Sequence, residues 1–267
     1  RVTIPRNDQD VTAPTVQSVR FQTVGHAITT IQVAYSERME PTSAVDLRNY
    51  SYSVQSAGPD GRFNTQDDTL WYLNNAVYNE STFTVTLLPT LPLPFHTLFQ
   101  LVINQAELNP NYDLGVRDLA RNLLDGDNDG RAGGRFLTTF AVGTNLTYTD
   151  ARGDQVNLKL NRGGQIQLTR DPSGEANTVR LVGTRAGQSE LTGSVRRPRR
   201  GGDGRAIIDR LEGAGGVRVR LNPNQFIIRS VSASSVPSTP PQTIDAVIEA
   251  QGQPGLFSRT RLGRSRR

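Results

Sequence analysis

Apolar and polar residues alternate with a period of two in many short stretches of this chain, and Gly, Pro, Asn and Asp separate these stretches. The alternation is typical of strands that bury one face of a sheet. In the first half of the chain it predicts strands at 16–21, 31–35, 70–73, 82–87, 99–103 and 136–140. Only 44–47 and 118–120 look helical, each for about one turn. The pattern therefore predicts an all-β fold, with a β-sandwich at the N-terminal end.

The second half keeps the alternation but has more Gly and Arg in its turns. It predicts strands at 156–160, 165–168, 179–182, 206–208, 217–221 and 226–228, and a return to strand or helical turn at 244–250. Short strands with few aromatic residues suit a small sandwich, a barrel or a short β-solenoid. Periodicity does not choose among the three, so the second domain is expected only to be rich in β-strands.

The length of 267 residues is enough for two domains with separate cores. We expect a linker at 1–10, a β-sandwich with acidic loops at 11–145, an Arg/Gly-rich β domain at 146–232, and a Pro/Ser linker with a basic tail at 233–267. The chain has no cysteine, which excludes disulfides and thiol chemistry. It has no apolar run of about 18 residues, so no membrane span is expected. Because it begins at Arg1, we expect a removed leader or a longer parent protein.

The two halves differ in charge. Residues 1–150 hold 10 arginines against 16 acids, and residues 151–267 hold 20 basic residues against 9 acids. Nearly all of the basic residues are arginine, whose planar guanidinium binds carboxylate, sulfate or phosphate in a bidentate way. The sequence predicts either an anionic polysaccharide partner or a solvated hairpin at Arg196, Arg197, Arg199, Arg200 and Arg205. We expect no binding of nucleic acid.

The stretch DGDNDG concentrates oxygen ligands. Asp125, Asp127 and Asp129 alternate before Gly130, which is the layout of calcium loops of the D-x-[DN]-x-[DN]-G kind. Three carboxylates at this spacing repel one another, and a hard divalent cation relieves the repulsion. The twelfth position of the loop is Phe136 in place of the usual bidentate Glu. We therefore expect calcium, with further ligands from backbone carbonyls, water or another loop.

A second acidic stretch is GPDGRFNTQDD. Asp60 lies in a Pro-Asp-Gly turn, and Asp67 and Asp68 follow it seven and eight positions later. The turn residues alone would also suit a solvated hairpin loop. Both interpretations, a calcium site and a hairpin loop, remain open at this point.

Several motifs in order, from DVTAPTVQSV through VAYSERMEP, GPDGRFNTQDD and STFTVTLLP to GVRDLARNLLDGDNDGRAGGRF, resemble the surface-layer-type bacterial Ig-like domain. The resemblance covers about residues 11–143. It implies a non-catalytic spacer or adhesion module of a secreted, cell-surface protein, whose partners are other domains of its polypeptide or cell-surface components. It also implies calcium as the bound ion, with the following ligands: Asp60, Asp67, Asp68, Asp125, Asp127 and Asp129.

The second half resembles the domains that follow such units, beginning at LTYTDARGDQVNLKL. Ala151 and Arg152 interrupt the acidic turn found there, which argues against a metal at Asp150 and Asp154. The interruption also spells Arg152-Gly153-Asp154, the tripeptide that animal integrins bind, in residues that are ordinary for a turn.

Catalysis is not expected from this sequence. The chain has two histidines, and it lacks a G-x-S-x-G elbow, an H-E-x-x-H motif and a Gly-rich phosphate loop. We therefore expect a non-enzymatic extracellular spacer or adhesion module. The alternatives are a polysaccharide-binding module and an accessory region of a larger secreted enzyme.

Overall fold

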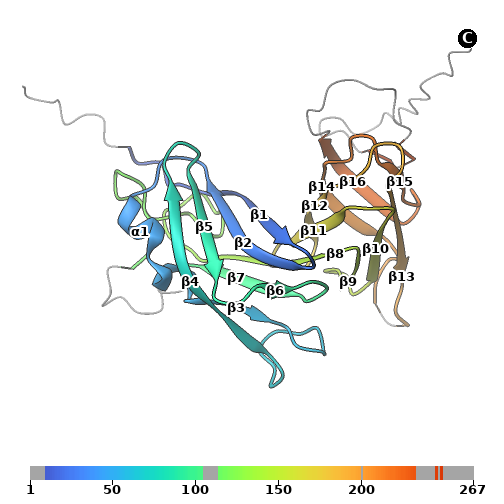
Figure 1. The fold of residues 1–267 in the computed structure, drawn as a ribbon, viewed down its shortest axis with the longest axis horizontal. Helices are drawn as coiled ribbons and strands as arrows, with labels where there is room; N and C mark the ends of the chain where they lie inside the picture. The colour runs from blue at the N-terminus through green and yellow to red at the C-terminus, as the bar shows by residue number, and fades with distance from the viewer. Residues whose placement is uncertain (1–9, 105–113, 200, 233–243, 246, 249–267) are drawn as a thin grey trace, which may run out of the picture. The chain divides into compact units, whose positions relative to one another are not determined.

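The structure is a computed structural model that describes residues 10–104, 114–199, 201–232, 244–245 and 247–248. The chain divides into two compact units, Arg1–Val142 and Gly143–Arg267. The all-β prediction is confirmed, because strands form nearly all of the regular structure in both units (Figure 1). The N-terminal linker, the Pro/Ser linker and the basic tail lie outside the described residues, apart from Asp10 and four residues of β17 and β18.

The first unit contains eight strands and two short helices among its described residues. They are β1 (Val16–Val24), β2 (Ala27–Tyr35), α1 (Pro41–Val45), the 3-10 helix η1 (Leu47–Tyr50), β3 (Ser53–Ser56), β4 (Thr69–Asn79), β5 (Thr84–Pro89), β6 (Leu93–Pro94), β7 (Phe99–Ile103) and β8 (Phe136–Gly143).

These strands form two layers that share β4. The first four residues of β4 pair with β3, which pairs with β7, and β7 pairs with β8. From Leu73 onward β4 pairs with β5, and β5 pairs with β2, which pairs with β1. The pairing shifts register between Leu73 and Asn75, where the strand passes from one sheet to the other. Such an irregularity bends a strand and increases its twist, which allows it to belong to both layers.

The apolar core of this unit lies between the two layers. Phe21 of β1 and Phe99 of β7 both stack on Phe140 of β8, with ring centroids 4.6 and 5.5 Å apart. Trp71 meets Phe99 edge to face at 6.0 Å, and Met39 is fully buried. The rings therefore fasten the two sheets together at the centre of the sandwich.

The predicted helical turn at 118–120 is wrong. Asp118 forms an isolated bridge with Met39, and its side chain accepts hydrogen bonds from the amide and the side chain of Asn122. The carboxylate closes a turn here, which offers the backbone an alternative to a helix. The sequence pattern also missed β3 and β6, which are short.

The second unit contains ten strands among its described residues. They are β9 (Asn145–Thr149), β10 (Gln155–Asn161), β11 (Gln165–Arg170), β12 (Ala176–Val182), β13 (Glu190–Arg196), β14 (Ala206–Glu212), β15 (Arg218–Arg220), β16 (Phe226–Ser232), β17 (Ile244–Asp245) and β18 (Val247–Ile248).

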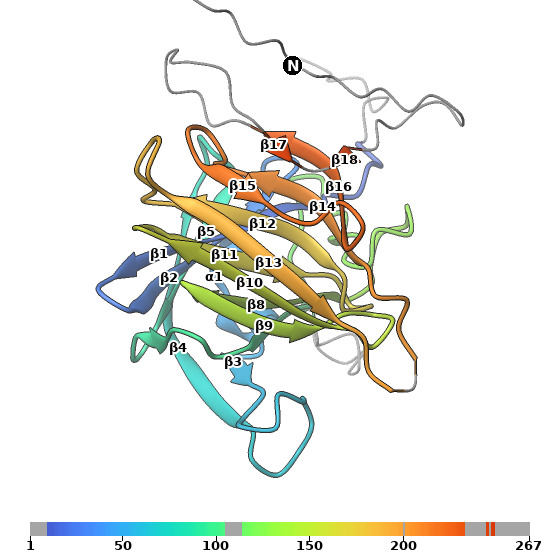
Figure 2. The ribbon, with the colours of Figure 1, turned by 90° about the vertical axis from the view of Figure 1, so that its right-hand side faces the viewer.

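The strand pairing shows a short, two-sheeted β-solenoid. After antiparallel pairs at β9–β10, β10–β13 and β11–β12, the chain alternates between two sheets. In one sheet β12, β14, β16 and β18 pair in parallel, and in the other β13, β15 and β17 do so. Figure 2 shows the two layers one behind the other. Successive strands lie in different sheets, and every second strand pairs in parallel within the same sheet. This pattern distinguishes a solenoid from a small sandwich or barrel of hairpins.

No helix in the described part of the chain is long and apolar enough to cross a membrane. The longest one, α1, has five residues.

Candidate metal centre

The structure brings together the three aspartates of the DGDNDG stretch. One carboxylate oxygen from each of Asp125, Asp127 and Asp129 lies within 4.8 Å of the others. Asp125 is 4 % exposed, whereas Asp127 and Asp129 are exposed. The Asp125 carboxylate thus lies at the buried end of the group, and the other two carboxylates lie on the solvent side, from which an ion can enter.

Backbone contacts hold this loop in place. The amide of Asp125 donates to the Pro14 carbonyl at 2.8 Å, and the amide of Gly126 donates to Gly133 at 2.8 Å. The Asp125 carboxylate accepts from the amides of Asp129 and Gly130 at 3.1 and 2.9 Å. The loop thus connects the segment before β1 with the segment before β8, and a change in the rigidity of the loop affects both segments.

Gly134 permits the close approach of Asp127. Its φ is +78°, and a Cβ added there would lie 2.5 Å from Asp127 Oδ1. Both the backbone conformation and the space therefore favour glycine at this position.

The donor set fits a hard divalent cation such as calcium, which prefers six to eight oxygen ligands. Three carboxylates provide part of such a shell. Phe136, at the twelfth position, begins β8 and packs against the core. It is therefore no ligand, and the shell must be completed by oxygens other than the usual glutamate.

The second predicted loop is closed by its own hydrogen bonds. Asp68 Oδ2 accepts from Gln55 Nε2 at 2.6 Å and from the amides of Asn64 and Thr65. Asp67 Oδ2 accepts from the amide of Asp60 at 3.2 Å, and Asp60 Oδ1 accepts from Arg62. Among the described residues these three aspartates are not gathered as the first group is. Calcium at this loop stays a prediction.

A third acidic group, which the sequence analysis missed, combines Asp10, Glu37 and Asp118. Its members are far apart in sequence, so no spacing motif could reveal it. Burial raises the pKa of Glu37, and the charges of Asp10 and Asp118 together with a hydrogen bond to Asp10 raise it further. The group is a place where negative charges meet in the folded chain.

Glu37→Gln is expected to stabilise the protein at pH 7 and to leave its stability unchanged at pH 4 and below. Because the pKa of Glu37 is raised on folding, its protonated form stabilises the folded protein. This contribution to the free energy of unfolding is full below the pKa of the unfolded state, about 4.3, and is lost as the pH rises through the pKa of the folded state. Glutamine mimics the protonated form at every pH. The measurement is thermal unfolding at both pH values in the presence of a chelator.

The control for this experiment is Glu80→Gln, which removes a carboxylate that pairs with Arg38 at 2.7 Å on the surface. Glu80→Gln should lower the melting temperature slightly at pH 7, whereas Glu37→Gln should raise it. A change in melting temperature of Glu37→Gln that is the same at pH 4 and pH 7 would contradict the prediction.

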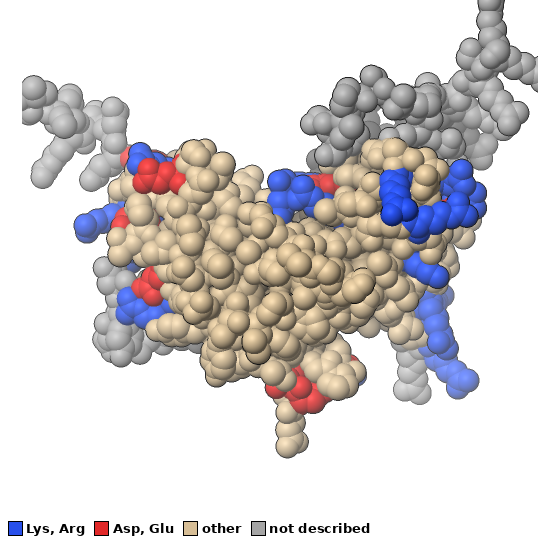
Figure 3. Space-filling model, viewed as in Figure 1, with Lys and Arg blue, Asp and Glu red and all other residues tan. Residues whose placement is uncertain are grey.

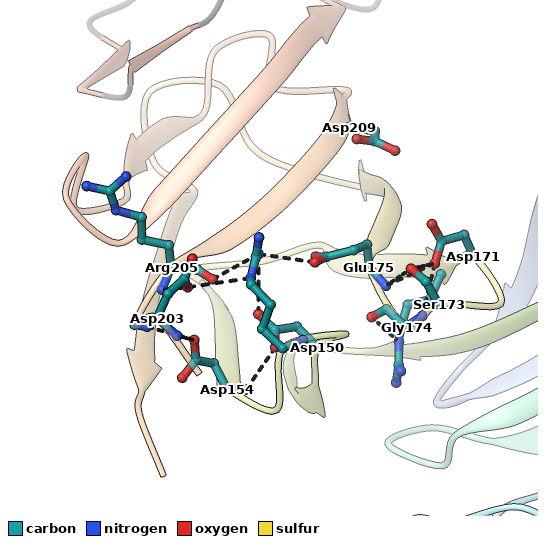
Figure 4. A network of polar contacts seen from close by, with 12 residues as sticks. Asp150, Asp154, Asp171, Ser173, Gly174, Glu175, Asp203, Arg205 and Asp209 are labelled. Atoms are coloured by element: carbon teal, nitrogen blue, oxygen red, sulfur yellow. Dashed lines mark hydrogen bonds and ion pairs between the residues drawn. The ribbon is translucent and has the colours of Figure 1, made fainter. Parts of the chain in front are cut away.

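A different network of carboxylates lies in the second unit, around the turn between β9 and β10 (Figure 4). Asp154 is fully buried, and its Oδ2 accepts from the amides of Asp203 and Gly204 at 2.9 and 2.7 Å. Asp150 Oδ1 accepts from the amides of Arg152 and Asp154 at 3.0 and 2.8 Å. The two aspartates hold the turn and tie it to the loop before β14.

Arg152 lies where a cation would be expected among these acids. Its guanidinium nitrogens lie 3.1 Å from Glu175, 3.4 Å from Asp203 and 3.6 Å from Asp150. Burial raises the pKa of Glu175, whereas the charge of Arg152 lowers it and the neighbouring aspartates raise it. The interruption of the acidic turn thus supplies an internal positive charge. The buried Asp154 also leaves Arg152-Gly153-Asp154 without an accessible carboxylate for an integrin.

Of the arginines predicted to bind polysaccharide, Arg196, Arg197, Arg199 and Arg205 are exposed. Arg200 lies outside the described residues. Arg196 ends β13, and the others lie in the loop that follows it.

No family model and no curated protein matches this chain. Among solved structures, the N-terminal part of the bacterial S-layer protein SbsC is 14 % identical, with a TM-score of 0.32 over 61 % of this chain and 32 % of that one. The structure of surface layer protein SbsC, domains 1-6, gives the same identity and TM-score over 19 % of its length. The chain thus spans less than a third of the length of these neighbours, and the likeness is distant.

Proposed function

We propose that this chain is a non-catalytic extracellular surface module in which calcium stiffens the loop of Asp125, Asp127 and Asp129. The observation that carries the proposal is the meeting of three carboxylates within 4.8 Å on one loop. The ordered motifs of residues 11–143 support the extracellular setting, since they resemble the bacterial Ig-like domain of secreted surface proteins.

Calcium would act on the first unit through the anchors of this loop. Without a cation, the three negative charges repel one another and favour opening of the loop. With a cation, the loop holds the residues before β1 against those before β8 through the bond from Asp125 to Pro14. A stiff loop would suit a spacer because the chain segment before β1 then keeps a fixed direction relative to the sandwich.

Calcium is expected to raise the melting temperature of the first unit. At a free concentration 100 times the dissociation constant, the stabilisation is about 2.7 kcal/mol. Trp71 is the only tryptophan and lies in this unit, so its fluorescence can follow the transition. The measurement compares thermal unfolding in EDTA with unfolding in increasing calcium.

Two variants test which of the two acidic loops binds calcium. Asp127→Asn with Asp129→Asn should abolish the rise caused by calcium, whatever its effect in EDTA. Asp67→Asn, which removes an exposed charge from the second acidic loop, should keep this rise. An unchanged melting temperature of the unsubstituted protein on addition of calcium would overturn the proposal. A rise lost only in Asp67→Asn would move the ion to the loop of Asp60, Asp67 and Asp68.

A further inference from the structure

The two sheets of the second unit differ in the charge balance of their outer faces. On β12, β14 and β16 the arginines have acidic neighbours in register. Arg229 meets Asp209 at 2.8 Å, and Arg180 and Arg210 lie 3.8 and 3.7 Å from Glu212. Three arginines thus share two carboxylates, and the charges on this sheet are nearly balanced.

The opposite face is formed by β9, β10, β13 and β15, and we call it the basic face. Strict alternation along these strands buries residues such as Leu158, Leu191 and Val219 and turns their neighbours outward. Lys159, Arg196, Arg218 and Arg220 are exposed on this face. Figure 3 shows Lys and Arg side chains gathered along the side where β13 and β15 lie.

Only one of these four cations has an acidic partner among the side chains that the structure describes. Arg220 lies 2.8 Å from Glu190, whereas no described carboxylate comes within ion-pair distance of Lys159, Arg196 or Arg218. Uncompensated positive charge is therefore concentrated on one sheet of the solenoid. A surface of this kind attracts anions and loses that attraction as salt increases.

Strand register sets the spacing of the cations. Lys159 pairs with Thr192, and Thr192 pairs with Arg220, so these positions form a row across three strands. Neighbouring strands are about 4.8 Å apart and alternate residues about 7 Å apart, which places the backbone of Arg220 about 7 Å from Arg218 and about 10 Å from Lys159. Arg196 lies four residues along β13 from this row, about 14 Å from Lys159 and Arg220. Duplex DNA carries one charge per about 1.7 Å, so it is much denser in charge than this face.

The groups between the cations suit sugar hydroxyls. Asn157 donates to Asn145 and Thr147 at 2.8 and 3.0 Å, and Thr192 and Ser194 also face outward. The outward positions of these strands carry no aromatic ring on which a base could stack. From the charge, its spacing and the polar groups between, we infer that the basic face binds a linear acidic polysaccharide through its carboxylates.

This surface differs from the loop that the sequence pattern singled out. Arg196 belongs to both, but Lys159, Arg218 and Arg220 come from strands that are distant in sequence. The proposed calcium loop lies in the first unit, so loss of calcium binding leaves polysaccharide binding intact. The binding experiment is therefore done in EDTA, which also prevents calcium from bridging polymer chains.

The test uses the full chain and sodium polygalacturonate as the probe. Arg196→Gln with Arg218→Gln is expected to weaken binding at least tenfold and to reduce its dependence on salt. The matched control is Arg210→Gln with Arg229→Gln, which removes the same charge from the balanced sheet and should change affinity less than twofold. Circular dichroism and thermal unfolding verify that both variants are folded.

Neutral dextran should not bind, and duplex DNA should bind more weakly than polygalacturonate at the same salt concentration. Equal losses of affinity for polygalacturonate in the two double variants would show that binding depends on net charge alone and would overturn the inference. Tighter binding of DNA than of polygalacturonate would also overturn it, as would an absence of polygalacturonate binding at low salt.

Discussion

Phe140→Ala is expected to lower the free energy of unfolding of the first unit by about 3–5 kcal/mol. Phe140 is fully buried and stacks on Phe21 from one sheet and on Phe99 from its own. Its removal leaves a cavity in the middle of the core and also ends both ring contacts. Because proteins of this size have only about 5–15 kcal/mol of stability, such a loss is a large part of the total.

Urea unfolding followed by Trp71 fluorescence measures this loss, since Trp71 packs edge to face on Phe99. The control is Tyr72→Ala, which removes a large ring that is 61 % exposed on the adjacent position of β4. Its effect should stay near 0.5 kcal/mol. A loss below about 1 kcal/mol for Phe140→Ala would mean that the two sheets do not depend on this contact.

Asp154→Ala is expected to destabilise the second unit by about 3 kcal/mol. The substitution removes the acceptor of two hydrogen bonds, and bonds to a charged group contribute about 1.5–3 kcal/mol each, part of which is offset because a buried charge is also removed. The amides of Asp203 and Gly204 are left without their partner. Asp154→Asn keeps one acceptor oxygen and should lose less than half as much.

Hydrogen exchange reports this change directly. The amides of Asp203 and Gly204 should lose protection in Asp154→Ala, while those of β2 and β5 in the first unit keep theirs. As a control, Asp203→Ala removes an exposed carboxylate that accepts from the amide of Arg205 at 2.9 Å and lies 3.4 Å from the Arg152 guanidinium, and it should cost about 1 kcal/mol. Unchanged protection at positions 203 and 204 would contradict the role given to Asp154.

Much of the fold could be predicted from local patterns. The strand at 99–103 was placed with the bounds of β7, and the alternation at 156–160 lies within β10. The pattern could not predict which strands pair. The solenoid depends on Ala206 pairing with Phe226 and Glu190 with Arg218, and such pairing across loops leaves no period of two in the sequence.

The candidate sites show the same difference between local sequence patterns and contacts made only in the fold. The Asp125 group lies on one continuous loop, so its spacing revealed it, whereas the group of Asp10, Glu37 and Asp118 is assembled from three segments. Arg218 and Lys159 were absent from the predicted basic site because they are neighbours only through β13. Sequence spacing detects sites on a single loop and misses sites that strand pairing creates.

The parallel pairing of β14 with β16 has a consequence for how the second unit can change in evolution. Ala206 meets Phe226 only 20 residues later in the chain, and each coil of a solenoid contacts only its neighbours. Duplication of such a segment would lengthen the stack by about 4.8 Å and add one more row of outward positions. The reach of this surface can therefore be adjusted in small steps, by copying a short piece of gene, while the existing core stays as it is.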